Sequence, residues 1–221
     1  MRNAHPGRAG NRVRTSLKGL GAVVALALIG TPPAATQTQL AALPTKTEPL
    51  VLRGNARPTQ AWVHFCRRNP AECAVNPSEP AAVELTPKVW QAIVAVNRKV
   101  NGDIKAVTDK EHWGVEDRWD FPDDGRGDCE DYQLLKRKLL VEAGLPRRTM
   151  RMTVVVDGDG QGHAVMMVRT TRGDFILDNK RNPVLPWHWT GYFYVKQEGQ
   201  EANMAWVLLG GANSPVATAN R

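Results

Sequence analysis

The segment from Gly125 to Tyr132 places one cysteine among acidic residues, directly after a glycine-rich approach. Its order, Gly-Arg-Gly-Asp-Cys-Glu-Asp-Tyr, predicts that Cys129 lies in the first turn of a helix that begins near Asp128. Free backbone N–H groups and the helix dipole stabilise a thiolate at such a position. Cys129 is therefore a candidate nucleophile, and its own backbone N–H is the natural donor to an oxyanion, with Trp119 as a candidate second donor.

A cysteine nucleophile also needs a base and a group that orients the base. His163 and Asp178 follow on two neighbouring predicted strands, which gives the order Cys, His, Asp. A tight turn at residues 172–173 would place Met167 opposite Asp178, on the same sheet face as the histidine. Because four residues along a strand span roughly 13 Å, contact between the two side chains then requires an earlier turn, a bulge or a bend.

Each of these residues also has an interpretation without catalysis. Cys129 could be a small buried residue at a helix start, and His163 a strand histidine whose neighbours satisfy its hydrogen bonds. Asp178 could cap the corner that it forms with Asn179. The order of the three residues alone does not decide between these interpretations.

Three carboxylates, those of Asp128, Glu130 and Asp131, lie beside the cysteine in the sequence. They would repel one another unless a positive charge lies among them. One interpretation is a capping box, with Asp128 as the N-cap and Asp131 three residues later. The other is a calcium site formed by all three acids, because hard cations bind several oxygen ligands and an extracytoplasmic setting supplies calcium. The two interpretations do not exclude each other.

The first 36 residues have the order of a secretory signal peptide. Five Lys and Arg residues fall within residues 1–18, an apolar run covers residues 20–29, and small residues follow from 31 to 35. A membrane-spanning helix needs roughly 20 apolar residues, so we expect cleavage between residues 34 and 42 and a periplasmic or otherwise exported protein. An uncleaved membrane anchor is the alternative.

The charge balance changes once this segment is removed. The 221-residue chain has a formal net charge of +7, with 29 Lys and Arg against 22 Asp and Glu, and no acid lies in residues 1–18. The mature chain keeps 24 bases against 22 acids. The basic composition therefore does not indicate a nucleic-acid partner. About 180 remaining residues are enough to bury one core, so one domain is expected.

Cys66 and Cys73 are the other two cysteines, and they bracket the pair Asn69-Pro70. On one continuous helix they would lie about 10 Å apart, which is beyond disulfide reach, so a bridge requires the helix to end near Pro70. With that break we predict a disulfide between Cys66 and Cys73, which leaves Cys129 as the free thiol. Two buried free thiols are the alternative.

The periodicity of apolar residues changes in the middle of the chain. Helices are predicted from Pro58, from Pro87 with Thr86 as N-cap, and from Asp128 to Ala143. The period then becomes two, which predicts strands at residues 150–156, 163–169, 175–177, 192–195 and 205–209. Residues 37–56 show no period and are interpreted as a linker, residues 57–209 as the domain and residues 210–221 as a flexible tail. Helices followed by antiparallel strands predict an α+β fold.

Several motifs together resemble one family, the bacterial transglutaminase-like cysteine proteinases. The resemblance extends over about residues 60–208, and its strongest signal is the string Gly-Asp-Cys-Glu-Asp-Tyr. The other matching residues are Asp117, Trp119, Pro122, Gly144-Leu145-Pro146, Gly162-His163-Ala164-Val165, and Gly173-Asp174 through Leu177-Asp178-Asn179. The resemblance implies a papain-like, transglutaminase-like core with N-terminal helices packed on an antiparallel sheet. It also implies that Cys129 is the nucleophile, His163 the general base and acid, and Asp178 the group that orients the imidazole.

The resemblance also implies a setting for the reaction. Its best understood relatives are periplasmic proteases that cleave large biofilm adhesins and bind calcium beside the active cysteine. An inner-membrane receptor regulates them. The acids that match their calcium site are Asp128, Glu130 and Asp131. We therefore expect a cysteine endopeptidase with a protein substrate in the cell envelope and no organic cofactor. The rival interpretations are a transglutaminase-like acyl transferase and a non-catalytic binding module.

Overall fold

The computed structural model describes residues 42–201 and 205–210, which all fall within the unit formed by residues 39–221. The expected signal peptide and nearly all of the expected tail lie outside the described residues. Within the described part of the chain, no helix is long and apolar enough to cross a membrane.

A seven-stranded antiparallel sheet forms the centre of the fold, with the strand order β1-β9-β8-β4-β5-β6-β7. Its strands are β1 (Leu52–Ala56), β4 (Met150–Val156), β5 (Gly162–Thr170), β6 (Gly173–Leu177), β7 (Leu185–Pro186), β8 (Phe193–Glu198) and β9 (Trp206–Leu209). Two short strands, β2 (Lys105–Ala106) and β3 (Arg126–Gly127), pair separately in parallel. All five predicted strands are confirmed, with bounds that differ by at most three residues.

The prediction that residues 37–56 form a linker is wrong for its last part, because β1 pairs with β9 at the edge of the sheet. The sequence Leu-Arg-Gly-Asn-Ala has no alternation, and the first four of these side chains are exposed. Backbone hydrogen bonds hold this edge strand, so its side chains carry no pattern that would predict it.

In the described part of the chain, five helices accompany the sheet: α1 (Gln60–Arg68), α2 (Pro70–Cys73), α3 (Pro87–Asp103), α4 (Asp109–Trp113) and α5 (Cys129–Glu142). Short 3-10 turns occur at Arg147–Thr149 and Trp187–Trp189. The predicted start of α3 is confirmed, since the Thr86 hydroxyl accepts a hydrogen bond from the Val89 N–H at 3.2 Å. The first helix begins two residues after Pro58, with Thr59 as its N-cap. Helix α4 was not predicted from the sequence, because it is short and polar.

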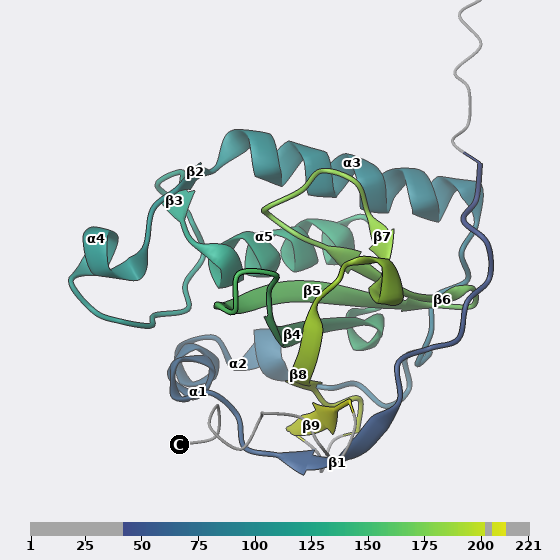
Figure 1. Ribbon diagram of the computed structural model, residues 1–221, viewed down its shortest axis with the longest axis horizontal. Coiled ribbons are helices and arrows are strands. Elements are labelled where there is room, and N and C mark those ends of the chain that lie inside the picture. The colour runs from purple at the N-terminus through teal and green to yellow at the C-terminus, as the bar shows by residue number, and fades with distance from the viewer. Residues whose placement is uncertain (1–41, 202–204, 211–221) are drawn as a thin grey trace, which may run out of the picture. The chain divides into compact units, whose positions relative to one another are not determined.

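Figure 1 shows α3 and α5 stacked on one side of the sheet, with α1 and α2 near the β9 end. One core cluster lies between these two helices and the sheet and includes Trp90, Ile93, Leu140, Met166 and Phe175. The opposite sheet face carries a second cluster that includes Val155, Val165, Met167 and Ile176. Alternate residues of β5 therefore enter different clusters, and both faces of the strand are buried.

The break at Asn69-Pro70 separates α1 from α2, and Cys66 forms a disulfide with Cys73 across it, with a Cα–Cα distance of 5.6 Å. Cys129 is the free cysteine. The geometry is the one that the predicted helix end at Pro70 requires.

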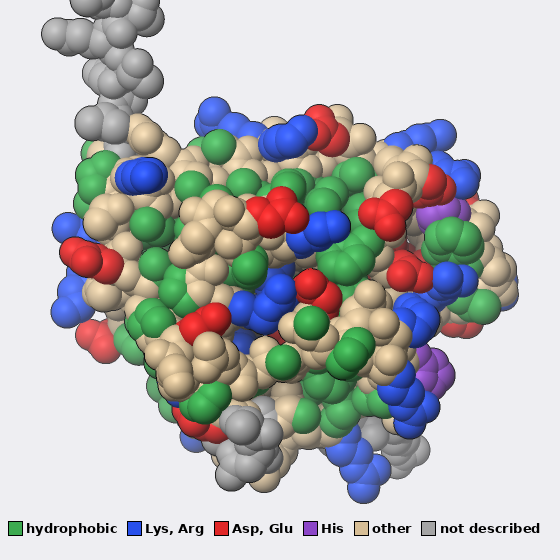
Figure 2. Space-filling view, turned by 180° about the vertical axis from the view of Figure 1, so that it is seen from behind, with side chains coloured by type: hydrophobic (Ala, Val, Ile, Leu, Met, Phe, Trp, Pro, Cys, Tyr) green, Lys and Arg blue, Asp and Glu red, His purple; other side chains and the backbone are tan. Residues whose placement is uncertain are grey.

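Charges are mixed on the surface. On the face shown in Figure 2, Lys and Arg side chains alternate with Asp and Glu side chains, and several of both kinds gather around a hollow near its middle.

Candidate active site

Cys129 is the first residue of helix α5, and Asp128 is the N-cap of that helix. The sulfur accepts a hydrogen bond from the Ala164 N–H at 3.3 Å and lies 3.2 Å from Oε2 of Glu130, to which the thiol donates. Cys129 and His163 both line a pocket of about 280 Å³. The backbone N–H of Cys129 lies in the first helical turn, where no intrahelical acceptor exists, so it can bind an oxyanion.

His163 and Asp178 are in contact: Nε2 of the histidine lies 2.9 Å from Oδ1 of the aspartate, and both side chains are buried. The pairing of Thr170 with Gly173 places the turn at residues 171–172, one residue earlier than predicted. With this turn, Asp178 lies two residues closer to His163 along β5 than expected. It comes directly after the last pair of the two strands, Met166 with Leu177. The offset of four residues expected from the later turn was wrong, and the remaining gap of two residues is short enough to close.

Other groups hold the carboxylate of Asp178 in place. The Tyr192 hydroxyl donates to Oδ2 at 2.6 Å, and the Lys180 N–H donates to Oδ1 at 2.9 Å. Burial raises the pKa of Asp178, but the hydrogen bonds from His163 and Tyr192 outweigh it and hold the pKa below its usual value. An ionised Asp178 accepts the hydrogen bond from the Nε2–H group of the imidazole, so Nδ1 is the nitrogen available to a thiol. Sequence reasoning missed Tyr192, because nothing in its local pattern marks it.

The structure adds two acids to the three that the sequence analysis proposed as metal ligands. Ligand oxygens of Asp109, Asp128 and Asp131 lie within 4.8 Å of one another, as do those of Asp109, Asp117 and Glu130. The described residues supply no hydrogen bond to the buried Oδ1 of Asp128. Five carboxylates around an orphaned buried oxygen fit a hard divalent cation, which binds six to eight oxygen ligands.

The capping-box interpretation of Asp128 and Asp131 is wrong for the half that the Asp128 side chain would supply, although Asp128 is the N-cap of α5. Asp128 makes no side-chain cap hydrogen bond; its Oδ2 accepts instead from the Asp109 N–H at 3.1 Å. Oδ1 of Asp131 accepts from the Asp120 N–H at 2.9 Å. The Asp128 carboxylate therefore holds the start of α4, whereas Asp131 holds the Asp120 N–H and also accepts a backbone hydrogen bond from Asp128.

Asp109 reaches the cluster because α4 begins there. A capping box between Thr108 and Glu111 starts this short helix. That Thr-Asp-Lys-Glu pattern is the sequence signal that could have located Asp109. Asp117 belongs to the family motif, but its position in the sequence indicates no ligand role. Its Oδ1 accepts the indole N–H of Trp119 at 3.1 Å, so this N–H is not free to bind an oxyanion.

Burial, and then crowding with other acids, raises the pKa of Glu130, Asp131 and Asp109. Burial and then the neighbouring charge of Asp128 raise the pKa of Glu130 well above its usual value. Burial is also the largest cause for Asp131 and Asp109, whose pKa values rise to about 8 and about 6. The pKa of the Cys129 thiol rises as well, through burial and then the charge of Glu130. Positive charge within the cluster would relieve all of these effects.

Comparison with known proteins gives one family. The model for the bacterial transglutaminase-like cysteine proteinases (BTLCP) matches residues 52–214. Among solved structures, calcium-bound LapG of Legionella pneumophila is 22% identical with a TM-score of 0.47, over 71% of this chain and 86% of that chain. The EGTA-treated LapG of the same organism is also 22% identical with a TM-score of 0.47, over 72% of this chain and 82% of that chain. No curated protein matches the chain.

Proposed function

Because the chain belongs to the bacterial transglutaminase-like cysteine proteinases, we propose that it hydrolyses peptide bonds with Cys129 as nucleophile, His163 as general base and acid, and Asp178 as the group that orients the imidazole. One observation carries the proposal. The Cys129 sulfur lies 3.3 Å from the backbone nitrogen of the residue that follows His163, and that histidine is bound to Asp178 at 2.9 Å.

In the first half of the reaction, His163 takes the thiol proton and the sulfur attacks the carbonyl carbon of the substrate. The carbonyl oxygen becomes an oxyanion, which the backbone N–H of Cys129 stabilises. His163 then gives its proton to the leaving amine as the C–N bond breaks. The product is a thioester on Cys129 and a free amine.

In the second half, His163 removes a proton from water, and the hydroxide attacks the thioester carbonyl. The C–S bond breaks, the acid leaves, and the sulfur recovers its proton from the imidazolium. Asp178 stays ionised throughout, because its hydrogen bonds to His163 and Tyr192 favour the charged form.

We propose calcium as the cation of the acid cluster, held by Asp128, Glu130 and Asp131 together with Asp109 and Asp117. The oxygen-rich donor set and the orphaned Oδ1 of Asp128 support this assignment. When bound, calcium would supply positive charge beside α5 and so lower the pKa of the Cys129 thiol.

The proposed setting is the cell envelope. A disulfide such as that between Cys66 and Cys73 persists in oxidising compartments, and the N-terminal sequence has the order of a signal peptide. A protein of the envelope, such as a surface adhesin, is then the proposed substrate. Regulation by an inner-membrane receptor stays a prediction.

Mapping of new peptide N-termini tests the function. Envelope proteins from the source organism are incubated with wild-type protein, with Cys129→Ala, or with wild-type protein plus chelator. We expect new N-termini with the wild type alone, because the variant lacks the nucleophile and the chelator removes the proposed cation. Equal cleavage by Cys129→Ala would overturn the proposal.

The same samples separate hydrolysis from acyl transfer. A labelled primary amine added to the reaction would be incorporated into protein by an acyl transferase, whereas a protease leaves it free. An unchanged calcium-dependent melting temperature in Cys129→Ala would show that this variant is folded.

A further inference from the structure

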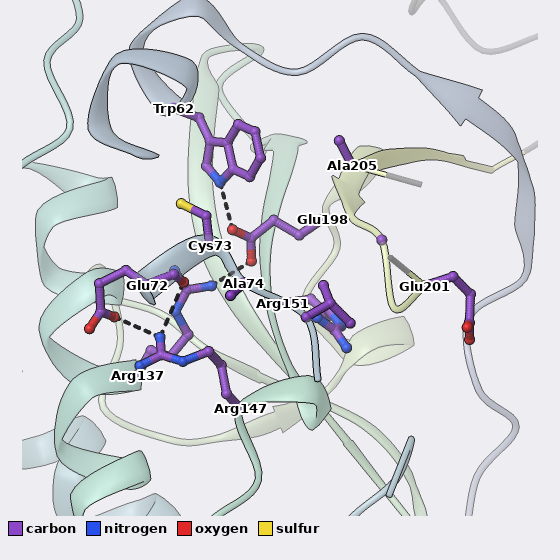
Figure 3. A pocket seen from close by; sticks show the side chains of 12 residues that line it. Trp62, Glu72, Cys73, Ala74, Arg137, Arg147, Arg151, Glu198, Glu201 and Ala205 are labelled. Carbon is purple, nitrogen blue, oxygen red and sulfur yellow. Dashed lines mark hydrogen bonds and ion pairs between the residues drawn. The ribbon is translucent and has the colours of Figure 1, made fainter. Parts of the chain in front are cut away.

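A second cavity, of about 320 Å³, lies apart from the Cys129 pocket and shares no lining residue with it. Figure 3 shows its side chains, which come from α1, α2 and the residues just after it, α5, the turn before β4, β4 itself, and the end of β8 with residues that follow it. The charged ones are Glu72, Arg137, Arg147, Arg151, Glu198 and Glu201. The cavity therefore holds charges of both signs, and each acid can be assigned its partner.

Each acid of the cavity already has a basic partner. Glu198 accepts from the Trp62 indole N–H at 2.6 Å through Oε1, and from Arg137 at 2.5 Å through Oε2. Figure 3 shows both contacts. The second oxygen also accepts the Met152 N–H at 3.0 Å, so neither oxygen of Glu198 is unused.

The other two acids are engaged as well. Glu72 pairs with Arg147 at 2.6 Å, and Glu201 pairs with Arg148 at 2.8 Å. Both partners are arginines outside β4. None of the three acids therefore pairs with the remaining cavity arginine, Arg151.

Arg151 is the cavity arginine whose Nε and Nη2 have no hydrogen-bond partner among the described residues. It is 4% exposed, and both of these atoms are buried. Burial is the main cause that lowers its pKa, to about 10; the nearby charge of Glu198 raises it, and the charges of Arg137, Arg148 and Arg169 lower it. The guanidinium nevertheless stays charged at neutral pH. Although Glu198 offsets part of its charge, two buried donors without an acceptor are costly, so this position favours a group that accepts from both.

A nearby arginine shows which anion would fit. Arg169 binds the carboxylate of Asp174 through Nε and Nη2, at 2.9 Å each. This edge of a guanidinium matches the two oxygens of a carboxylate or phosphate group. Arg151 has the same two atoms unfilled.

We propose that this cavity is a binding site for an oxyanion, a carboxylate or phosphate group, held by the guanidinium of Arg151. The neighbouring Arg147 and Arg137 are each paired with an acid of the cavity, so Arg151 is the group on which anion binding depends. The site is independent of the Cys129 chemistry, because binding requires none of the triad residues.

The test uses the full chain with calcium below the concentration at which its phosphate precipitates. Inorganic phosphate and acetate are titrated separately, with chloride at equal ionic strength as the reference, and melting temperature and heat of binding are measured. We expect a saturable rise in melting temperature with one or both probes. Arg151→Met should bind the effective probe at least tenfold more weakly, since one bidentate charged contact is lost.

Two further variants complete the test. Arg98→Met removes an exposed arginine of α3 and should bind like the wild type. Arg151→Lys keeps the charge but lacks the paired N–H donors of the guanidinium edge, so it should bind the probe more weakly than the wild type does. A response to phosphate alone or to acetate alone identifies the group, and a response to both identifies a shared oxyanion site.

A wild-type measurement keeps the proposal testable if Arg151→Met does not fold. The Nε–H resonance of Arg151, assigned with Arg151→Lys, should shift saturably during the titration. No saturable response to either probe, or an equal response in Arg151→Met and the wild type, would overturn the site.

Discussion

The Tyr192 hydroxyl donates a 2.6 Å hydrogen bond to Oδ2 of Asp178, while Oδ1 of the same carboxylate lies 2.9 Å from Nε2 of His163. The rings of Tyr192 and His163 also meet edge to face, with centroids 5.8 Å apart. Tyr192 therefore fixes the carboxylate and the imidazole together, although it lies just before β8 and far from Cys129 in sequence.

Tyr192→Phe should weaken the orientation of His163. A hydrogen bond to a charged acceptor contributes about 1.5 kcal/mol or more, so we expect kcat/KM to fall about tenfold. Loss of the bond should also raise the pKa of Asp178, because burial then opposes its ionisation with one donor fewer. The acid limb of the pH profile of kcat/KM should therefore move to higher pH.

The neighbouring Tyr194 supplies the matched control. Its hydroxyl contacts Thr190 and the Trp187 carbonyl, both at 3.0 Å, and not Asp178. Tyr194→Phe should leave the pH profile in place. Identical profiles for both variants would count against a positioning role for Tyr192.

Gly127→Ala should disturb the acid cluster through space rather than backbone strain. A Cβ at this position would lie 2.6 Å from Oδ2 and 2.7 Å from Cβ of Asp131. Because the Asp131 Cβ is fixed by α5, rotation of the carboxylate cannot remove the clash. We expect a loss of about 1–3 kcal/mol in unfolding free energy, measured in urea, and a smaller stabilisation by calcium.

Gly102→Ala is the control for that experiment. The exposed Gly102 lies within α3 and has open space around its Cβ position. This change should stabilise the protein by about 0.5–1 kcal/mol, since alanine favours a helix. If Gly127→Ala were as stable as the wild type, a Cβ at residue 127 would have room beside the Asp131 side chain, and the predicted clash would be wrong.

Asp109→Asn tests the ligand that sequence reasoning missed. The amide oxygen can still accept the hydrogen bond from the Arg118 N–H, so the local fold should survive. The lost charge should lower calcium affinity tenfold or more by calorimetry, because calcium sites depend on carboxylate charge. Asp123→Asn, at an exposed neighbouring position, should bind calcium like the wild type. Equal affinities in the two variants would remove Asp109 from the site.

The sequence predicted the elements that have strong periodicity or clear caps. Helix α3 and strands β4 and β5 bury regular apolar sets, and Thr86 caps α3 as expected. Helix α5 was located by its start at Asp128 and its stop signals after Ala143, because most of its buried side chains are polar. The edge strand β1 and the short helix α4 depend on backbone pairing and one polar cap, so apolar periodicity could not show them.

The contact between His163 and Asp178 could be predicted only in part from the sequence. The face shared by the two residues followed from strand parity, but their distance depended on the exact turn. A shift of one residue in that turn, to positions 171–172, closes most of the gap. Asp109 and Tyr192 reach the site through tertiary packing, and this information is absent from local sequence.

The acid cluster also predicts how stability depends on pH when calcium is absent. Burial is the main cause that raises the pKa of Asp109 to about 6 and that of Asp131 to about 8. In chelator, the folded protein therefore binds protons that the unfolded chain has already released. Unfolding free energy should fall as pH rises from about 4 to about 8, since the folded state gains stability from proton binding only below its own pKa values.

Calcium should abolish or reverse this slope, because the cation favours the ionised carboxylates. Urea unfolding at several values between about pH 5 and about pH 8, in chelator and in saturating calcium, measures both slopes. The stabilisation by calcium should therefore be largest at the alkaline end. Parallel slopes in the two conditions would mean that the cation, if it binds, does not contact these carboxylates.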